Sequence, residues 1–317
     1  MNEFELIRKY FTRPAPNALL GVGDDAALLQ VSAGNVLAVS TDMLVSGTHF
    51  LPDADPFLLG HKTLAVNLSD IAAMGATPRW ATLAIALPEA DEAWLGKFSA
   101  GFFALAQQHG VELVGGDTTR GPLNLCVTIF GEVPAQQALR RSGAQPGDEV
   151  WVSGTLGDAA LALAHLQDRI LLSESEFTAC AQVLHQPQPR IALGLALRGV
   201  ASSAIDISDG LLADLGHILD ASRAGAQIEL ALLPVSPAMQ PYAATPPGMQ
   251  CILSGGDDYE LCFTAPAARH AEIAAIGARL SLRLSCIGKI VAGSGCIVHD
   301  AAGNRIDLES GGYEHFR

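Results

Sequence analysis

Short apolar runs that end at acidic or glycine-bearing turns recur along this chain, separated by longer segments with helical spacing. The β-branched run Val36 to Val39 predicts a strand with Ser40-Thr41-Asp42 at its C-terminal end. Spaced leucines between Pro56 and Met74 predict a long helix that stops at Gly75. The apolar run Trp80 to Leu87 predicts another strand. The first part of the chain therefore mixes strands with helices.

The same patterns cover the rest of this first part. Phe4 to Phe11 has helical spacing, and Asp91 reads as the N-cap of a helix closed by Gly110. Val111 to Val114 predicts a short strand that runs into a loop, Gly115 to Thr119, and Leu123 to Val133 predicts a further strand.

A polar stretch from Pro134 to Asp148 carries the turn signal Pro146-Gly147-Asp148 and predicts a domain boundary, which we place between 137 and 138. Beyond it, strands are expected at 149–153, 203–207, 227–232, 261–264, 282–290 and 296–298, and helices at 158–167, 173–184, 190–197, 211–224 and 267–278. The segment before Ser254 reads as a Pro-rich connection. Strands that alternate irregularly with helices favour α/β or α+β layers over a helical bundle.

The net charge of the chain limits the classes of partner that we expect. The 317 residues include 19 Lys plus Arg against 33 Asp plus Glu, a formal net charge of −14. No basic cluster is longer than Arg140-Arg141, so nucleic acid is not expected as a partner. An acidic protein still binds anionic substrates when divalent cations bridge carboxylate to phosphate. Acidity therefore favours metal-phosphate chemistry.

The start of the chain has no basic segment followed by an apolar one, and no apolar run is long enough to span a bilayer. We therefore expect a cytoplasmic protein without a membrane partner. Six cysteines are scattered without any Cys-x-x-Cys pair, which favours buried free thiols over a zinc site or a disulfide framework.

Two adjacent acids, Asp24 and Asp25, lie in the glycine-bounded stretch Gly21 to Ala27. Neighbouring carboxylates repel each other and lose hydration on folding, so a cation is a natural reason to keep both ionised. Similar Asp-bearing turns occur at Ser40-Thr41-Asp42, Asn67-Leu68-Ser69-Asp70, Gly115-Gly116-Asp117 and Asp206-Ile207-Ser208-Asp209-Gly210. Each alone is most often a capped turn, but their number favours magnesium, which prefers oxygen ligands.

Other nucleotide and catalytic signatures are missing. Neither a Gly-x-x-x-x-Gly-Lys-Ser/Thr loop nor a strand-following Gly-x-Gly-x-x-Gly occurs, and there is no nucleophile elbow or His-Glu-x-x-His helix. His49 in a small-residue loop could reach a ligand or be a plain surface histidine. Arg141 could contact a phosphate or form a rim salt bridge, and Tyr313 could stack on a planar ligand or dock the tail.

In combination, these motifs resemble the thiamine-monophosphate kinase family of the aminoimidazole-ribonucleotide synthetase-like ATP-binding superfamily. The blocks follow the family order and span nearly the whole chain; they are Gly21–Ala27, Ser40–Met43 with His49-Phe50, Ala65–Gly75, Gly115–Thr119, Arg141–Ala144, Ala204–Leu211 and Ser254–Leu261. The blocks at Asn67–Gly75 and Gly255–Leu261 are the specific ones; the others are shared across the superfamily.

The resemblance implies a two-domain α/β (α+β) fold. Residues 1–137 would form an ATP- and metal-binding domain that pairs across a homodimer into a shared β-barrel, and residues 138–317 a C-terminal α/β domain that completes the active site. It implies ATP-dependent phosphorylation of thiamine monophosphate to thiamine diphosphate with several Mg²⁺ ions. Because the acceptor phosphate oxygen is already ionised, we expect direct in-line transfer with no covalent nucleophile.

Site residues follow from the resemblance position by position. The implied magnesium ligands are Asp25, Ser40, Thr41, Asp42, Asp70, Asp117, Asp206 and Asp209. The implied nucleotide contacts are Gly116, Asp117, Arg141 and Ser208, and the implied thiamine contacts are His49, Asp257 and Tyr313. Asp24 is left as a turn-former or outer group. Asp257 departs from the family, which commonly has Glu there.

Two alternatives stay open. One is another ATP-using enzyme of the superfamily, of the selenophosphate synthetase, hydrogenase-maturation or purine-pathway type. The first typically uses an N-terminal Cys, whereas the first Cys here is Cys126; the second ends in a functional Cys, whereas this chain ends in Arg317. The other is a non-catalytic acidic protein that binds metal without nucleotide.

Overall fold

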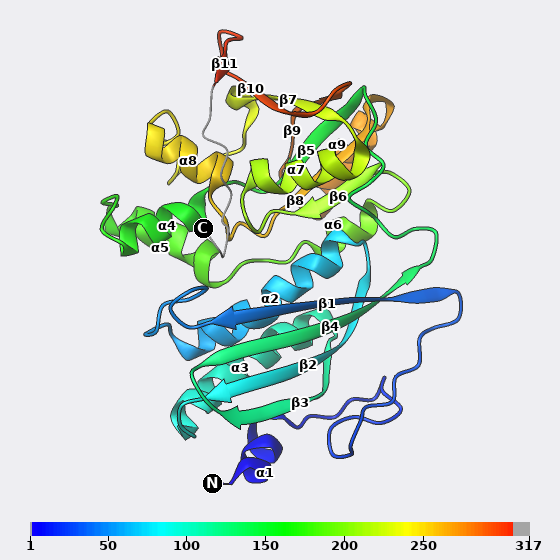
Figure 1. Ribbon diagram of the computed structural model, residues 1–317, viewed down its shortest axis with the longest axis vertical. Helices are drawn as coiled ribbons and strands as arrows, with labels where there is room; N and C mark the ends of the chain where they lie inside the picture. The colour runs from blue at the N-terminus through cyan, green and yellow to red at the C-terminus, as the bar shows by residue number, and fades with distance from the viewer. Residues whose placement is uncertain (1, 307–317) are drawn as a thin grey trace. The chain divides into compact units, whose positions relative to one another are not determined.

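The computed structural model describes residues 2–306 and divides them into two compact units. Unit 1 takes the chain up to Ile71 together with Ala76–Gln136. Unit 2 takes the chain from Gln137 onward together with the short stretch Ala72–Gly75, which lies at the end of a unit 1 helix. Figure 1 shows the course of the chain through both units.

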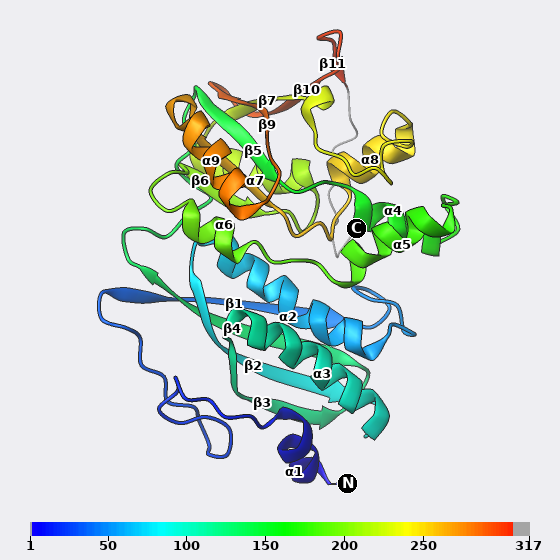
Figure 2. The same ribbon diagram turned by 180° about the vertical axis from the view of Figure 1, so that it is seen from behind.

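Unit 1 contains a four-stranded sheet in the order β1-β4-β2-β3. The strands are β1 (Asn35–Val45), β2 (Thr77–Leu87), β3 (Glu112–Arg120) and β4 (Asn124–Pro134). β4 is antiparallel to β1 and β2, and β2 is parallel to β3. Helices α2 (Pro56–Ala73) and α3 (Glu92–His109) cover one face of the sheet (Figure 2).

Two strands are longer than predicted. Ser40-Thr41-Asp42 lies in the middle of β1, because β4 pairs with β1 over its whole length from Asn35 to Val45. Gly115 to Thr119 likewise lies within β3, since β2 continues the parallel ladder to Arg120. The predictions that Ser40-Thr41-Asp42 lies at the end of its strand and that Gly115 to Thr119 forms a loop after a short strand were wrong. Their acidic side chains project from a rigid sheet.

The expected helices of unit 1 are confirmed. Asp91 caps α3 by accepting hydrogen bonds from the backbone of Ala93 and Trp94, and Gly110 closes it in the left-handed conformation at φ +66°. The N-terminal helix is split into α1 (Glu3–Leu6) and the π-helix η1 (Ile7–Phe11). The buried core of this unit combines both covering helices with the sheet: Leu64, Leu68, Ile71, Leu95, Phe98, Phe102, Leu125 and Ile129.

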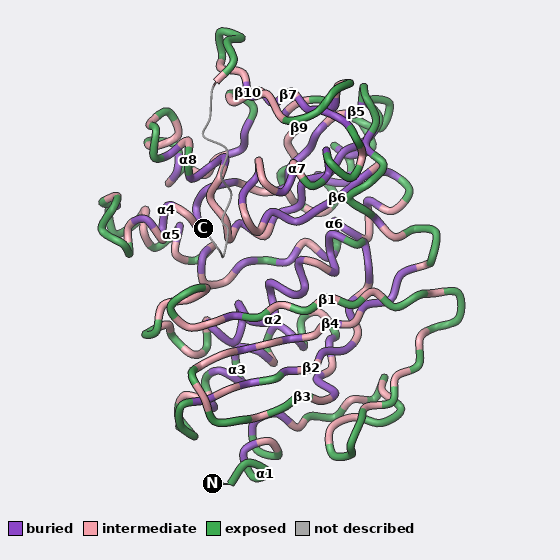
Figure 3. The backbone as a smooth tube through the Cα atoms, viewed as in Figure 1, coloured by how far each residue is buried: buried purple, intermediate pink, exposed green. Residues whose placement is uncertain are grey.

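On the face of the unit 1 sheet opposite α2 and α3, β1 exposes apolar side chains. Val39 and Met43 on β1 are 54% and 53% exposed. Leu37 on the same face is exposed as well, and Figure 3 shows β1 mostly in the colours of exposed and intermediate residues. A strand with apolar side chains on its solvent side is a typical interaction surface.

Unit 2 contains a seven-stranded mixed sheet in the order β11-β10-β7-β9-β5-β8-β6. Its strands are β5 (Asp148–Ser153), β6 (Ser203–Asp206), β7 (Gly225–Glu229), β8 (Leu261–Pro266), β9 (Leu284–Val291), β10 (Gly295–His299) and β11 (Arg305–Ile306). Its helices are α4 (Asp158–Leu166), α5 (Glu174–His185), α6 (Ile191–Ala196), α7 (Leu211–Ser222), α8 (Pro246–Ser254) and α9 (His270–Leu280), with two 3₁₀ turns, η2 (Leu230–Leu232) and η3 (Ala267–Arg269).

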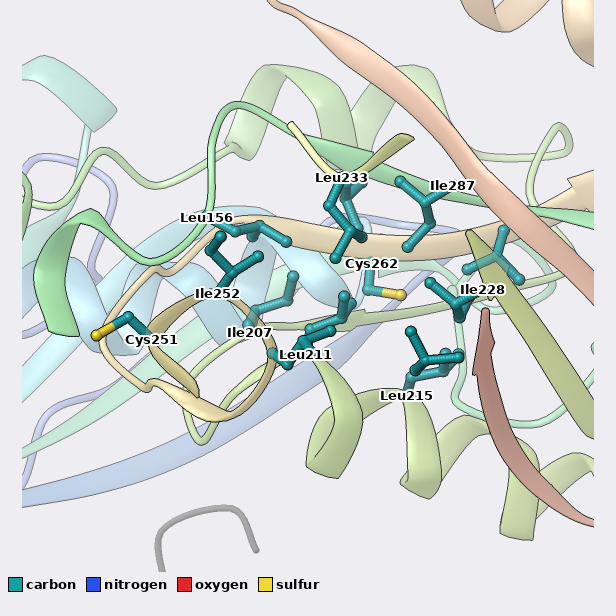
Figure 4. Packing of buried hydrophobic residues seen from close by; sticks show 14 of the residues in the cluster. Leu156, Ile207, Leu211, Leu215, Ile228, Leu233, Cys251, Ile252, Cys262 and Ile287 are labelled. Carbon is teal, nitrogen blue, oxygen red and sulfur yellow. The ribbon is translucent and has the colours of Figure 1, made fainter. Parts of the chain in front are cut away.

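The core of unit 2 joins the sheet to these helices. Figure 4 shows Leu211 and Leu215 of α7 packing near Ile228 of β7 and Cys262 of β8. Ile207, just beyond β6, is also fully buried in this cluster. The core thus fixes the point at which the loop after β6 begins.

Helix α8 was not predicted. The sequence there is Pro-rich, but both prolines, Pro246 and Pro247, fall in the first turn, where a missing N–H costs nothing. Thr245 caps the helix by accepting a hydrogen bond from Gly248. The short strand β11 was also missed.

No helix among residues 2–306 combines the length and apolar character needed to cross a membrane. All six cysteines are free thiols; Cys180, Cys251 and Cys262 are buried, as predicted, whereas Cys126, Cys286 and Cys296 are only half-buried.

Candidate functional site

The best-defined polar cluster of unit 1 joins β1 to α2. Ser40 donates a 2.5 Å hydrogen bond from Oγ to Oδ2 of Asp70. One turn earlier on α2, Asn67 accepts a 3.2 Å hydrogen bond from the backbone N–H of Asp42 and donates to the carbonyl of Thr63. Asn67 is fully buried. Its side chain therefore fixes the strand at the residue that carries the Asp42 carboxylate.

Thr41 does not share this arrangement. Successive side chains of a strand point to opposite faces. The hydroxyl of Thr41 lies 2.9 Å from that of Thr128 on β4, away from the helices, whereas Ser40 reaches α2. On the helix-covered face, Thr41 could offer only its main-chain carbonyl oxygen.

The acidic stretch around Asp24 and Asp25 lies in an irregular segment that runs from Thr12 to Gly34 without any helix or strand. Both acids are exposed. Oδ1 of Asp24 accepts a 2.9 Å hydrogen bond from the N–H of Asp25, after Gly23 at φ +127°. Asp24 thus forms the turn, which leaves the carboxylate of Asp25 presented to solvent.

Two glutamates of the sheet anchor this segment. Glu112 at the start of β3 accepts hydrogen bonds from the N–H and the side-chain amide of Asn17. Glu132 on β4 accepts two from Ser32, at 2.7 and 2.8 Å. Burial pushes the pKa of Glu132 up, but the Ser32 hydrogen bonds and the Arg79 charge outweigh it and leave that pKa below its ordinary value. The segment that carries Asp25 is therefore held at both ends.

Gly116 and Asp117 lie on β3, the strand at the far edge of the sheet from β1. A Cβ at Gly116 would lie 1.9 Å from the carbonyl oxygen of Leu83, and its φ is +145°, so the backbone itself requires glycine here. Asp117 is exposed. Three strand spacings separate this edge from Asp42, a distance of about 14 Å. The carboxylates of Asp42 and Asp117 in one chain are too far apart to ligate the same ion.

His49 follows β1 in a tight turn. Its Nδ1 accepts a 3.0 Å hydrogen bond from the N–H of Val45, and its own N–H donates to the carbonyl of that residue. A neutral ring that accepts at Nδ1 carries its proton on Nε2. The ring orientation is therefore set by the backbone.

In unit 2, the loop after β6 is organised by a residue that was not predicted. Asp214, in the first turn of α7, accepts hydrogen bonds at Oδ2 from the N–H groups of Ser208, Asp209 and Gly210, at 3.0, 3.0 and 3.1 Å. Burial raises the pKa of Asp214 to about 7, and the charge of Asp209 adds to the increase while the N–H groups oppose it. Asp206 is buried at the end of β6.

The turn that carries Asp257 lies against this loop. The N–H of Asp257 donates to the carbonyl of Ser208 over 2.9 Å. Gly256 has no room for a side chain, because a Cβ would lie 2.4 Å from the same carbonyl oxygen. The predicted nucleotide contact at Ser208 and the predicted thiamine contact at Asp257 are thus neighbours in unit 2.

Arg141 lies on a segment fixed by its backbone. Ser222, at the end of α7, accepts hydrogen bonds at Oγ from the N–H groups of Gly143 and Ala144 and donates to the carbonyl of Arg141. The Arg141 residue itself is exposed. Its guanidinium group is therefore carried on an ordered support.

Within residues 2–306, no three His, Cys, Asp or Glu side chains lie close enough together to hold a metal ion. The predicted donors are carboxylate and hydroxyl oxygens, the type that magnesium prefers, and magnesium usually completes its shell with phosphate and water oxygens. Tyr313 falls outside the described residues. Sequence reasoning missed Asn67 and Asp214 as site-building residues, although both belong to or follow directly the Asp-bearing blocks.

Both parts of the chain match models of known protein families. Residues 23–133 match the model of the AIR synthase related protein, N-terminal domain, and residues 145–301 match that of the C-terminal domain.

Individual relatives match almost end to end. The thiamine-monophosphate kinase of Escherichia coli K12 is 48% identical over 320 residues, covering 99% of this chain and 98% of the relative. The crystal structure of the thiamine-monophosphate kinase from Stenotrophomonas maltophilia K279a is similar with a TM-score of 0.85 at 50% identity, covering 92% of this chain and 93% of the other. A structure of AaThiL complexed with AMPPCP and TMP is similar with a TM-score of 0.78 at 31% identity, covering 90% and 89%.

Proposed function

The chain belongs to the AIR synthase related family and, within it, to the thiamine-monophosphate kinases, and we propose from this membership that it phosphorylates thiamine monophosphate with ATP, giving thiamine diphosphate and ADP. The observation that carries the proposal is the 48% identity to such a kinase over 99% of the chain. The complex of AaThiL with AMPPCP and TMP supports the same pair of substrates.

For the proposed reaction, the protein has to bind and orient two anionic substrates, ATP and thiamine monophosphate. The acceptor is a phosphate oxygen that is ionised at neutral pH, so the transfer requires no general base and no protein nucleophile. We propose direct in-line transfer. In unit 2, Asp214 holds the loop at Ser208, and the turn at Asp257 is hydrogen-bonded to that loop. Both substrates would thereby be bound on one hydrogen-bonded framework.

The proposed magnesium ligands are those implied by the family. They are Asp25, Ser40, Thr41, Asp42, Asp70 and Asp117 in unit 1, and Asp206 and Asp209 in unit 2. Magnesium, when bound, would neutralise phosphate charge and align donor with acceptor. Ser40 keeps the carboxylate of Asp70 in place, and Asn67 holds the backbone at Asp42. Thr41 would contribute its carbonyl oxygen.

The nucleotide and thiamine contacts are proposed on the same basis. Gly116, Asp117, Arg141 and Ser208 would contact ATP, and His49, Asp257 and Tyr313 would contact thiamine monophosphate. His49 supports this role because its Nδ1 is already engaged by Val45, which directs Nε2–H to other partners.

We propose a homodimer that is built through the sheet of unit 1. The uncovered apolar face around Val39 and Met43 supports it, because exposed apolar strand faces are normally covered by a partner. If two four-stranded sheets closed into one barrel, the β3 edge of a second copy would lie beside β1, and the face that carries Val39 and Met43 would turn inward.

The six free cysteines are consistent with a reducing compartment, and we propose a cytoplasmic enzyme.

The function is tested by incubating the protein with magnesium, ATP and thiamine monophosphate and separating the products by chromatography. Formation of thiamine diphosphate in step with ADP is expected. ATP turnover on aminoimidazole precursors without thiamine diphosphate would overturn the proposal in favour of another superfamily activity. A metal-binding protein without catalysis would instead gain thermal stability from magnesium and nothing further from ATP.

A further inference from the structure

The turn from Gly255 to Glu260 has an unusual backbone. Asp257 and Tyr259 adopt φ values of +70° and +49°, in the left-handed region that non-glycine residues rarely occupy. Asp tolerates this region better than most residues, whereas Tyr does not. Backbone strain of this kind persists only where the surroundings impose it, and it concentrates at functional sites.

On its outer side, this turn is joined to the loop after β6 by three backbone hydrogen bonds. The N–H groups of Asp257 and Tyr259 donate to the carbonyls of Ser208 and Ile207, at 2.9 and 2.8 Å. The N–H of Ile207 in return donates to the carbonyl of Glu260 over 2.8 Å. These hydrogen bonds therefore hold Asp257 and Tyr259 in place relative to the loop that carries Ser208, the proposed nucleotide contact.

On its inner side, the alternate residues of the turn are buried carboxylates. Both oxygens of Asp258 accept the N–H of Gly157, at 3.0 and 3.1 Å. Glu260, with a side chain 7% exposed, accepts hydrogen bonds from Nε of Arg190 at 2.7 Å and from Oγ of Ser153 at 2.5 Å, and is paired with Nη2 of Arg190 as well.

The lack of a side chain at Gly154 leaves the space that the Glu260 carboxylate occupies. Gly154 has φ +62°, and a Cβ there would lie 2.0 Å from Oε1 of Glu260. Ser153 also accepts the N–H of Leu261, so the hydroxyl joins the carboxylate to the start of β8. A bidentate guanidinium–carboxylate pair with an added hydroxyl fixes both the position and the rotation of the carboxylate.

Arg190 belongs to none of the Asp-bearing motifs of the sequence and lies just before α6 and after Pro187 and Pro189. Its side chain is 25% exposed, whereas that of Glu260 is 7% exposed, so the carboxylate side of the pair is buried and the guanidinium side is partly open to solvent. Breaking a buried pair by removing one partner leaves the other charge uncompensated, and the turn that carries it has to move.

We propose that Arg190, acting through Glu260, is a positioning residue for the phosphate acceptor. The pair holds the inner side of the turn so that Asp257 stays in its strained conformation beside Ser208. The inference rests on the proposed function, since it takes Asp257 as a thiamine contact. In this role Arg190 would act through Glu260 and not by contact with a substrate.

The test compares Arg190→Gln and Arg190→Lys with Arg269→Gln, which breaks the exposed pair of Arg269 with Glu272. With thiamine monophosphate varied at saturating ATP, Arg190→Gln is expected to raise KM for thiamine monophosphate about tenfold or more, because small displacements of binding groups carry large penalties. Arg190→Lys, which restores the charge without the second hydrogen bond, should recover part of the loss. Arg269→Gln should match the wild type.

Coupling distinguishes positioning from a general loss of structure. Glu260→Gln should raise the same KM, and the double variant Arg190→Gln/Glu260→Gln should be no worse than the poorer single variant, because both act through one pair. If KM for thiamine monophosphate is unchanged while only the melting temperature falls, the proposal is overturned. Should Arg190→Gln fail to fold, Ser153→Ala removes one hydrogen bond to Glu260 and is expected to raise the same KM by a smaller factor.

A failure of the proposed function would show separately, as a wild-type protein that forms no thiamine diphosphate. Hydrogen exchange at Asp257 and Tyr259 then tests the positioning role without turnover. Faster exchange in Arg190→Gln than in Arg269→Gln supports the role, and equal exchange overturns it.

Discussion

Ser40 on β1 and Asp70 on α2 are joined by a 2.5 Å hydrogen bond, which links the predicted strand motif to the predicted helix motif. If Asp70 is a magnesium ligand, Asp70→Asn should lower kcat/KM by about 100-fold or more while the melting temperature changes little. Ser40→Ala should have a smaller effect, because it removes a proposed hydroxyl ligand and the group that orients the Asp70 carboxylate but leaves the charge of that carboxylate in place. Steady-state kinetics and thermal melts of both variants measure this.

The control for this pair is Ser69→Ala. Ser69 neighbours Asp70 on the same helix, is buried, and its hydroxyl has no hydrogen-bond partner among the described residues. Its removal should leave activity near the wild-type value. Equal losses of activity and stability in Asp70→Asn would mean that Asp70 is a structural residue.

Asp25→Asn should damage catalysis more than Asp24→Asn. The carboxylate of Asp24 accepts the N–H of Asp25 and forms the turn, and an Asn side-chain oxygen can still accept that bond. The Asp25 carboxylate is exposed and, as a proposed ligand, loses its charge in the variant. Kinetics at several magnesium concentrations would measure the order, and the reverse order would show that the roles of the two acids are exchanged.

Val39→Lys should convert the proposed dimer into a monomer and reduce activity together with it. A charge on the uncovered sheet face would be desolvated at a dimer interface, which is strongly unfavourable. Analytical ultracentrifugation gives the oligomeric state. Leu171→Lys is the matched control, since Leu171 is 86% exposed in unit 2. A wild type that sediments as a monomer would contradict the dimer outright.

Glu132 should make stability depend on pH. Its pKa in the folded state lies below the ordinary 4.5, so its contribution is complete above about pH 4.5 and is lost as the pH falls through the folded pKa. Glu132→Gln should therefore lower the free energy of unfolding at pH 7 by about 1–3 kcal/mol, the cost of a weakened buried hydrogen-bond set. Urea titrations at several pH values should show the two proteins converging under acid conditions; a constant difference would contradict the assignment.

Local signals predicted the helices well. Asp91 and Gly110 lie next to the helix that they delimit, so α3 could be read from the sequence. The ends of β1 and β3 could not, because their length is set by ladders to β4 and β2, whose residues lie far along the chain. Helix α8 was not predicted because prolines interrupt most helices and are tolerated only in the first turn, where they lie here.

The residues of the candidate site likewise fall into those that the sequence predicted and those that it did not. The Asp-bearing blocks were visible as motifs, but the residues that build their geometry act on backbone groups of other segments. Asn67 holds the backbone of β1, and Asp214 gathers the N–H groups of a loop that precedes it. Such contacts depend on tertiary packing, and a single sequence carries no signal for them.

The residues at the C-terminal end of α2 and just beyond it, Ala72–Gly75, belong to unit 2, and this limits where the chain can be cut. The N–H of Leu139 donates to the carbonyl of Met74, Arg198 donates from Nε to that of Gly75, and a side chain at Gly194 would collide with the carbonyl of Ala72. A fragment cut at residue 136 would lose all three partners. The carbonyls of Met74 and Gly75, just after the helix that presents Asp70, would then lose their hydrogen-bond donors, so a proteolytic or recombinant half-molecule should fray at that end. Replacing one half of this chain by the corresponding half of a relative should therefore be tolerated less well than replacing the whole chain.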